Sequence, residues 1–259
     1  MKYLMMICIL ATSFSALAEI KTEEISYHAD VPLKGFIAYD DALQAPLPGV
    51  LIVHEWWGHN QNTRDKALAF AKAGFVAMAL DMYGEGKTTE HPKEATEFMN
   101  QALASQDVAN VRFEQALKVL QAHARTNAKK IGAVGYCFGG KVVLDQARQG
   151  TKLTGVVSIH GGLFPMKNDK NKKIKTPILV LHGEEDPMVS DALLVSFTKE
   201  METKGADFEF VSFPGVVHAF TNPGATEVGK KFNLPLAYDE KADKEAHEKA
   251  IAFLIAHSK

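Results

Sequence analysis

Short strand-like runs alternate with amphipathic stretches along the chain. Residues 49–53 form a continuous apolar run, as expected for a strand covered on both faces, and residues 63–73 carry apolar positions at helical spacing. Strands are predicted at 25–29, 34–39, 49–53, 75–80, 130–135, 156–160, 178–182 and 208–213. Helices are predicted at 63–73, 92–104, 108–124, 139–149, 190–204 and 240–256. The first two strands are expected to pair as a hairpin, and Thr63 and Gly74 are the expected cap and stop of the first helix.

This alternation predicts an α/β fold: a mostly parallel, doubly wound sheet with helices on both faces. Functional groups in such sheets gather at the carboxyl ends of the strands. The positions to inspect therefore follow Val53, Leu80, Gly135, Ile159, Leu181 and Phe213.

The first 18 residues have the pattern of a secretory signal peptide. Lys2 precedes a mostly apolar run, and Ala16-Leu17-Ala18 fits the small-residue cleavage rule. A buried or membrane-anchoring first helix is the alternative, but the apolar run is short for a bilayer span. We expect a secreted or periplasmic protein in which residues 19–259 form one domain.

Composition narrows the classes of function. The 29 basic and 31 acidic residues give a formal charge of −2, which supplies no excess of positive charge for nucleic acid or anionic membranes. The two cysteines, Cys8 and Cys137, cannot build a disulfide scaffold or a four-thiolate zinc site. Signal cleavage would leave Cys137 as the single thiol.

Cys137 lies in the segment Gly135-Tyr136-Cys137-Phe138-Gly139-Gly140, between a predicted strand and a predicted helix. This is the spacing of a nucleophile elbow, with cysteine where serine is common. Glycines two residues before and after the nucleophile allow close backbone approach, and the helix N-terminus favours a thiolate. A buried structural cysteine in a glycine-rich turn is the alternative.

Two later strand ends carry the partners that such a nucleophile needs. Asp186 follows the strand at 178–182, and His218 follows the strand at 208–213. Nucleophile, acid and histidine is the chain order of the α/β-hydrolase triad, in which the carboxylate orients the imidazole. Glu184 and Glu185 compete with Asp186 for the acid role, and Asp186 is our choice.

The segment His54-Glu55-Trp56-Trp57-Gly58 follows the strand at 49–53. In this fold the loop after that strand gives one N–H to the oxyanion hole, and the residue after the nucleophile, Phe138, gives the other. Glu55 is expected beside the thiol, where it would take the thiol proton or reject anionic substrates. Trp56 and Trp57 either pack in the core or form an apolar wall for substrate.

Together these segments resemble the dienelactone hydrolase family, from the strand at 49–53 to the loop around Phe220. The motifs are His-Glu-Trp-Trp-Gly at 54–58, Arg-Asp at 64–65, Leu-Asp-Met-Tyr-Gly at 80–84, Gly-Tyr-Cys-Phe-Gly-Gly at 135–140, His-Gly-Glu-Glu-Asp-Pro at 182–187 and Gly-Val-Val-His-Ala-Phe at 215–220. The resemblance implies an α/β-hydrolase fold with Cys137 as nucleophile, His218 as base and Asp186 as its partner. It also implies that Glu55 helps to generate the thiolate, and that the N–H groups of Trp56 and Phe138 form the oxyanion hole.

Two positions depart from the family pattern. Studied members have arginines for the substrate carboxylate shortly after the Asp-Leu-Tyr motif and four residues after the histidine. Here Glu85 and Asn222 occupy those regions. A buried carboxylate without a cation is costly, so a neutral ester, lactone or thioester is the expected substrate. Trp57, Tyr83, His160 and Phe220 are the candidate substrate contacts, although His160 could equally be a strand-end packing residue.

The predicted activity is hydrolysis of carboxylic esters or lactones through an acyl-thioester on Cys137. The sequence predicts no cofactor and no metal, since the ten histidines form no HExxH-type spacing. A ligand-binding protein without catalysis and a thiol redox protein on the same scaffold are the alternatives. The Cys-Asp-His order argues against the first, and the lack of a second mature cysteine against the second.

Overall fold

The computed structural model describes residues 19–166 and 173–259, so the predicted signal peptide, with Cys8, lies outside the described residues. The described part contains one eight-stranded sheet in the order β1-β2-β4-β3-β5-β6-β7-β8. Its strands are β1 Ile20–His28, β2 Pro32–Asp40, β3 Leu47–Val53, β4 Val76–Leu80, β5 Thr126–Tyr136, β6 Val156–Ile159, β7 Ile178–Gly183 and β8 Phe208–Phe213. β1 and β2 form the predicted hairpin, β2 also runs antiparallel to β4, and every pair from β4 to β8 is parallel.

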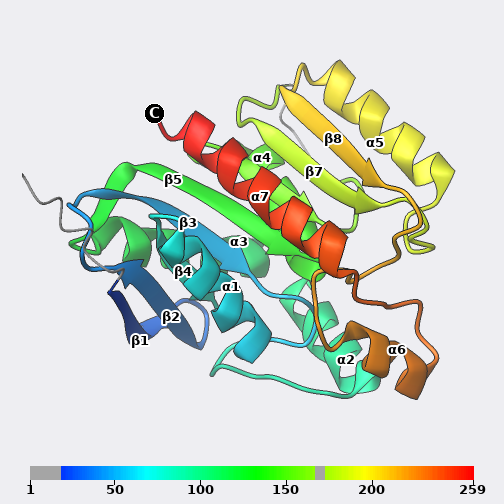
Figure 1. The fold of residues 1–259 in the computed structure, drawn as a ribbon, viewed down its shortest axis with the longest axis horizontal. Helices are drawn as coiled ribbons and strands as arrows, with labels where there is room; N and C mark the ends of the chain where they lie inside the picture. The colour runs from blue at the N-terminus through cyan, green and yellow to red at the C-terminus, as the bar shows by residue number, and fades with distance from the viewer. Residues whose placement is uncertain (1–18, 167–172) are drawn as a thin grey trace, which may run out of the picture.

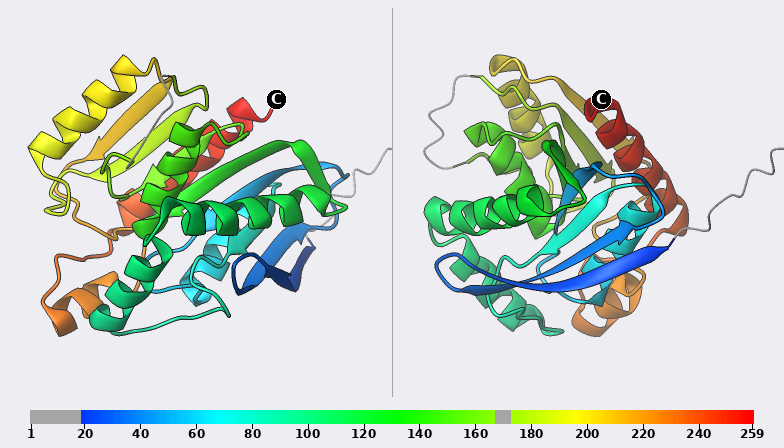
Figure 2. Two further views of the ribbon diagram at one scale, coloured as in Figure 1. Left: turned by 180° about the vertical axis from the view of Figure 1, so that it is seen from behind. Right: turned by 90° about the vertical axis from the view of Figure 1, so that its left-hand side faces the viewer.

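Helices cover both faces of the sheet (Figure 1 and Figure 2). They are α1 Gln61–Lys72, α2 Pro92–Ala102, α3 Gln106–Ala122, α4 Phe138–Gln149, α5 Asp191–Thr203, α6 Ala225–Phe232 and α7 Glu240–His257. α1 and α7 lie on one face, while α3, α4 and α5 pack on the other. α2 and α6 lie side by side beyond one end of the sheet, where the rings of His91 and Phe232 contact each other. The predicted doubly wound α/β architecture is therefore confirmed.

The apolar core forms two layers because alternate residues of a strand point to opposite faces. In β5, Ala133 belongs to the layer beneath α3, α4 and α5, and Val134 belongs to the layer beneath α1 and α7. Phe113 and Phe70 are fully buried examples from the two helical layers. The inner strands β3, β4, β6 and β7 are buried along nearly their whole length, which explains why their sequences are continuous apolar runs.

Several predicted boundaries were wrong for local reasons. Asn60, not Thr63, caps α1: its side-chain oxygen accepts the N–H of Thr63, and the chain turns helical two residues earlier than predicted. β5 begins at Thr126 rather than at residue 130, because its polar first residues extend the pairing with β3, where Thr126 lies opposite Leu47. α6 was not predicted, since its eight residues are mostly polar or small. Gly74, the predicted stop of α1, does follow that helix with a φ of 93°.

The parallel strands bring their carboxyl ends to one edge of the sheet. The turns after β3, β5, β6, β7 and β8 therefore meet there, although they are far apart in sequence. Among the helices of residues 19–166 and 173–259, none combines the length and apolar character needed to cross a bilayer.

Candidate active site

Cys137 occupies a strained turn between β5 and α4. Its φ of 53° and ψ of −113° lie outside the regions that a non-glycine residue normally adopts. A Cβ at position 135 would lie 2.0 Å from the carbonyl oxygen of Gly139, and a Cβ at position 139 would lie 2.3 Å from that of Val53. The turn therefore has room for Cys137 only because both positions are glycine, as the elbow spacing predicts.

His218 and Asp186 meet beside this turn. The Nδ1 of His218 lies 2.7 Å from Oδ2 of Asp186, and both side chains are buried. The other carboxylate oxygen of Asp186 accepts the N–H of Met188 at 2.9 Å. Glu184 and Glu185, the competing acids, are exposed.

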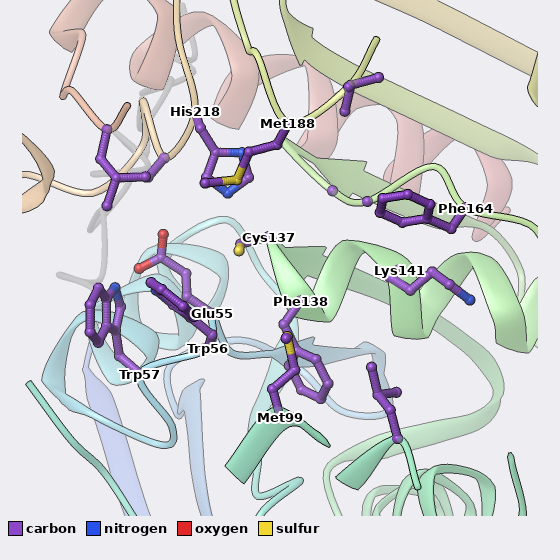
Figure 3. A pocket seen from close by; sticks show the side chains of 16 residues that line it. Glu55, Trp56, Trp57, Met99, Cys137, Phe138, Lys141, Phe164, Met188 and His218 are labelled. Carbon is purple, nitrogen blue, oxygen red and sulfur yellow. The ribbon is translucent and has the colours of Figure 1, made fainter. Parts of the chain in front are cut away.

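The second ring nitrogen of His218 faces the thiol. Figure 3 shows the imidazole and the sulfur of Cys137 on facing sides of one cavity. Among the described residues, Nε2 of His218 is buried with no hydrogen-bond partner. Burial by itself lowers the pKa of His218, but the negative charges on Cys137 and Asp186 outweigh it and raise that pKa to about 10. The site thus favours the protonated, imidazolium form of His218.

Glu55 lies in the same cavity, with its carboxylate directed into it (Figure 3). Its Oε2 accepts hydrogen bonds from Asn222 at 2.5 Å and from Asn62 at 3.4 Å, while its buried Oε1 has no partner among the described residues. Burial raises the pKa of Glu55, and the Asn222 hydrogen bond and the charge of His218 oppose that rise. The position four residues after the histidine therefore holds this carboxyl with an amide rather than with a cation.

The loop that carries Glu55 and Trp56 is fixed from both sides. His54 donates from Nδ1 to the carbonyl of Glu55 at 2.5 Å and accepts the N–H of Met82 at Nε2, 3.2 Å away. Tyr83 donates its hydroxyl to the carbonyl of Trp56 at 3.1 Å. Complete burial lowers the pKa of His54 to about 4, so its ring is neutral and keeps this pattern at neutral pH.

Trp56 and Phe138 both line the cavity, and no acceptor among the described residues takes their backbone N–H groups. Within the described part of the chain, the N–H of Trp56 donates to no protein acceptor. Phe138 is the first residue of α4, where an N–H has no acceptor within its own helix. The side chain of Phe138 stacks on the ring of His54 at 5.6 Å between centroids, which ties the two loops together.

The cavity has a volume of about 380 Å³ and an almost entirely apolar surface. Its lining residues are Glu55, Trp56, Trp57, Met99, Leu103, Cys137, Phe138, Lys141, Gly161, Gly162, Phe164, Met188, Val189, His218, Ala219 and Leu236. Lys141 contributes its methylene groups, because its ammonium bonds to the carboxylate of Asp145 on the next turn of α4. Leu103, Phe164 and Met188 are 38%, 53% and 40% exposed and form what we call the apolar mouth.

Three predicted substrate contacts lie outside this lining. Tyr83 is occupied with the Trp56 carbonyl, Phe220 packs fully buried against Phe213, and His160 is fully buried behind the elbow. Trp57 does line the cavity, and its contact with substrate stays a prediction. Glu85, which occupies the region where the family pattern has an arginine, is exposed and absent from the lining, so it does not set the charge of the site.

The residues that hold the site from behind, and most of those in its apolar wall, were not predicted from the sequence. His54 follows β3 directly, so its strand-end position could have drawn attention to it. The lining residues from α2 and from the loops after β6 and β7 are ordinary apolar side chains, and nothing in the sequence separates them from core residues. Among the described residues, no group of three or more His, Cys, Asp or Glu is placed to hold a metal ion.

Comparison with known proteins agrees with this geometry. The model of the dienelactone hydrolase family matches residues 33–258. The chain belongs to the dienelactone hydrolase family. This family member is 28% identical over 216 residues to a putative carboxymethylenebutenolidase of Aquifex aeolicus, covering 82% of this chain and 89% of the relative. It is 30% identical over 185 residues to the protein usf of Aquifex pyrophilus, covering 70% and 80% of the two chains.

This chain is also similar in three-dimensional structure to a solved protein. It is a dienelactone hydrolase-like promiscuous phosphotriesterase from metagenomic libraries, with a TM-score of 0.87 and 27% identity. The match covers 93% of this chain and 99% of the other. The fold is therefore that of the α/β hydrolases, and this dienelactone hydrolase family member is an ester or lactone hydrolase.

Proposed function

We propose that the protein hydrolyses neutral, apolar carboxylic esters or lactones with Cys137 as nucleophile. The observation that carries the proposal is the arrangement of His218. One ring nitrogen is bonded to Asp186 at 2.7 Å, and the other is buried and unpartnered among the described residues, in the cavity that holds the thiol. This is the geometry of a base that is oriented by a carboxylate and aimed at a nucleophile.

The reaction follows in two halves. The Cys137 thiolate adds to the carbonyl carbon, and the N–H groups of Trp56 and Phe138 stabilise the oxyanion. The imidazolium of His218 then gives its proton to the departing alcohol, and an acyl-thioester remains. In the second half, neutral His218 takes a proton from water, the hydroxide adds to the thioester, and the acid leaves as the thiolate returns. Asp186 holds the ring in the tautomer that both halves require.

Glu55 has a supporting part in this scheme. Its carboxyl lies in the cavity near the thiol with one oxygen unpartnered among the described residues. We place it as the group that takes the proton from Cys137 wherever that residue is a neutral thiol when substrate enters, which yields the thiolate that the first half requires. The side-chain hydrogen bonds that Glu55 accepts come from the amides of Asn222 and Asn62, and the charges of His218 and Lys66 favour its anionic form.

The substrate class follows from the lining. An anionic group would leave water for an apolar wall in which Lys141 is already paired with Asp145. A neutral ester, lactone or thioester has no such cost. The apolar lining also favours a second candidate, uncharged phosphate triesters, the substrate class named for the solved relative at 27% identity.

The test is turnover of p-nitrophenyl acetate by wild type, Cys137→Ala and Cys137→Ser, with an aryl dialkyl phosphate as the alternative substrate. We expect loss of turnover in Cys137→Ala and an acetyl adduct on wild type in rapid-quench mass spectrometry. Equal activity in wild type and Cys137→Ala would refute the assigned nucleophile. Binding without turnover would favour the ligand-binding alternative, and sulfenate formation without an acyl adduct would favour thiol redox chemistry.

We further propose that residues 1–18 direct export and are removed after Ala18. The basic residue, apolar run and Ala-Leu-Ala site support this proposal. Intact mass of the protein recovered from the periplasmic or culture fraction tests it, because a chain that begins at Glu19 is expected there.

A further inference from the structure

His160 is a fully buried histidine that the proposed reaction does not use. It follows β6 and sits behind the elbow, with no atom in the lining of the cavity. Its φ is 39°, which is strained for a residue with a Cβ. Cys137 and Ala219, with φ values of 53° and 59°, are strained in the same way. Strain of this kind persists only where surrounding contacts enforce it, and it collects at functional sites.

The two ring nitrogens of His160 bond to two different parts of the site. Nδ1 accepts the backbone N–H of Cys137 at 3.1 Å, and the same N–H is shared with the carbonyl oxygen of Ile159, also at 3.1 Å. Because a backbone N–H can only donate, Nδ1 is unprotonated and the proton is on Nε2. Nε2 then donates to the hydroxyl of Thr221 at 2.8 Å. Thr221 lies three residues after His218 on the same loop.

The ring of His160 also contacts two rings of the loop that carries His218. The ring of His160 meets that of His218 edge to face at 5.2 Å between centroids, and that of Phe220 at 5.2 Å. Burial, followed by the charges of His218 and Lys66, lowers the pKa of His160 well below its ordinary value. A neutral ring keeps one acceptor and one donor, which the two hydrogen bonds need.

We propose that His160 is a positioning residue that sets the separation of the Cys137 thiol and the His218 imidazole, by bonding the elbow at one ring nitrogen and the His218 loop at the other. The inference rests on the proposed function, since it concerns the pair that would carry out the reaction. It differs from a substrate contact, because the ring lies outside the cavity. It differs from plain core packing, because both ring nitrogens have specific partners on the two loops.

The experiment compares His160→Asn with His160→Leu. Asparagine places its side-chain oxygen near the position of Nδ1, can accept the Cys137 N–H and tolerates a positive φ. Leucine has similar bulk but no acceptor. Thr221→Val removes the other bond without changing shape. Thr126→Val is the matched control, because that hydroxyl is buried at the far end of β5 without a partner among the described residues.

Two quantities are measured on each folded variant: kcat and KM for p-nitrophenyl acetate, and the rate of Cys137 alkylation by iodoacetamide between pH 5 and 9. A displacement of about 1 Å between reacting groups costs on the order of 100-fold in rate. We expect His160→Leu to lower kcat by about 10-fold to 100-fold with KM changed less than about twofold. His160→Asn should recover most of that loss, and Thr221→Val should lose kcat while Thr126→Val does not.

The alkylation profile separates this inference from the proposed function. We expect His160→Leu and Thr221→Val to shift alkylation to higher pH, because a displaced His218 stabilises the thiolate less. A folded His160→Leu with wild-type kcat and alkylation would overturn the positioning role. So would equal losses in His160→Asn and His160→Leu, or a rise in KM alone. If instead wild type and Cys137→Ala turn over substrate equally, the proposed function fails, and the alkylation profiles still decide the role of His160.

Discussion

At the scale of single residues, the site differs from its family pattern in charge. The position expected to hold a cation for a substrate carboxylate is Asn222, and its amide serves Glu55 instead. Lys141 lies along the wall but is committed to Asp145. The free energy for binding substrate must then come mainly from apolar contact, which scales with the area removed from water. We therefore expect the exposed apolar mouth to determine how activity depends on substrate size.

The mouth leads to a prediction about chain length. Each methylene that becomes buried contributes about 0.8 kcal/mol, or roughly a fourfold gain in binding. We expect kcat/KM to rise from p-nitrophenyl acetate to butyrate to octanoate, and the rise to be flatter in Phe164→Ala and Leu103→Ala. Val195→Ala is the control, because this valine is 68% exposed on α5 and outside the cavity. If kcat/KM rises equally with chain length in wild type and in Phe164→Ala, the mouth does not contact substrate.

The three candidate triad residues could be picked out from the sequence because they follow one another in the order nucleophile, acid and histidine. The residues that support them could not. Cys137, Asp186 and His218 stand at strand ends with glycines or a proline nearby, and such residues mark the turns where functional groups are expected. His160 stands at a strand end too, but its partners Cys137 and Thr221 are 23 and 61 residues away. Which ring nitrogen meets which group depends on how three loops fold together, and the sequence pattern does not contain that information.

At the scale of elements, the β5–α4 turn that carries Cys137 depends on two glycines. A methyl group on residue 139 would lie 2.3 Å from the Val53 carbonyl oxygen and 2.8 Å from that of His54. Both are backbone atoms of the neighbouring strand and loop, so neither can rotate away. Relief requires α4 or β3 to move, and either movement displaces the thiol or the loop that carries Glu55.

We therefore predict that Gly139→Ala is both less stable and less active. Overpacking of this kind costs about 1–3 kcal/mol in the free energy of unfolding, measured by urea denaturation. We expect a loss of kcat larger than the loss of stability explains, measured at a temperature where the variant is fully folded. Gly224→Ala is the control, since a Cβ there meets one atom at 3.4 Å. Wild-type stability in Gly139→Ala would mean that α4 moves freely against β3.

Element types were easier to predict than element ends. The buried strands β3, β4, β6 and β7 are apolar throughout because both faces are covered, so they stand out from the sequence. The start of α1 was misplaced because Asn60 and Thr63 are both good capping residues, and only the backbone shows that Asn60 is extended, with a φ of −90° and a ψ of −177°. α6 was missed because a short polar helix has no periodic signal.

At the scale of the whole molecule, the sheet collects turns from distant parts of the chain around several buried histidines. His54 and His160 each have no measurable exposure, and burial lowers the pKa of both. Each ring holds a loop through one donor and one acceptor nitrogen, which only the neutral form provides. The stability of the fold and the geometry of the site are therefore linked to the same protonation states.

This linkage predicts a loss of stability in acid. The pKa of His54 is about 4 in the folded protein and about 6.5 in an unfolded chain. As the pH falls below about 6.5, the unfolded chain takes up this proton first, so the folded state loses stability until the pH reaches about 4. The shift corresponds to about 3 kcal/mol for His54 alone, fully present above pH 6.5 and lost near pH 4. Glu55, whose pKa is raised by burial, acts in the opposite direction, so a comparison of variants is needed.

Urea denaturation of wild type, His54→Gln and His28→Gln at several pH values between 7.5 and 4.5 provides that comparison. His54→Gln should be less stable than wild type at pH 7.5, because it loses the fit of the ring to Glu55 and Met82. The difference in free energy of unfolding between wild type and His54→Gln should become steadily smaller below pH 6.5. The reason is that glutamine takes up no proton in either the folded or the unfolded state. His28 is exposed, so its variant should follow wild type throughout. A gap between wild type and His54→Gln that stays constant down to pH 4.5 would mean that His54 accepts its proton without unfolding. The loop that carries Glu55 and Trp56 would then tolerate a charged ring behind it.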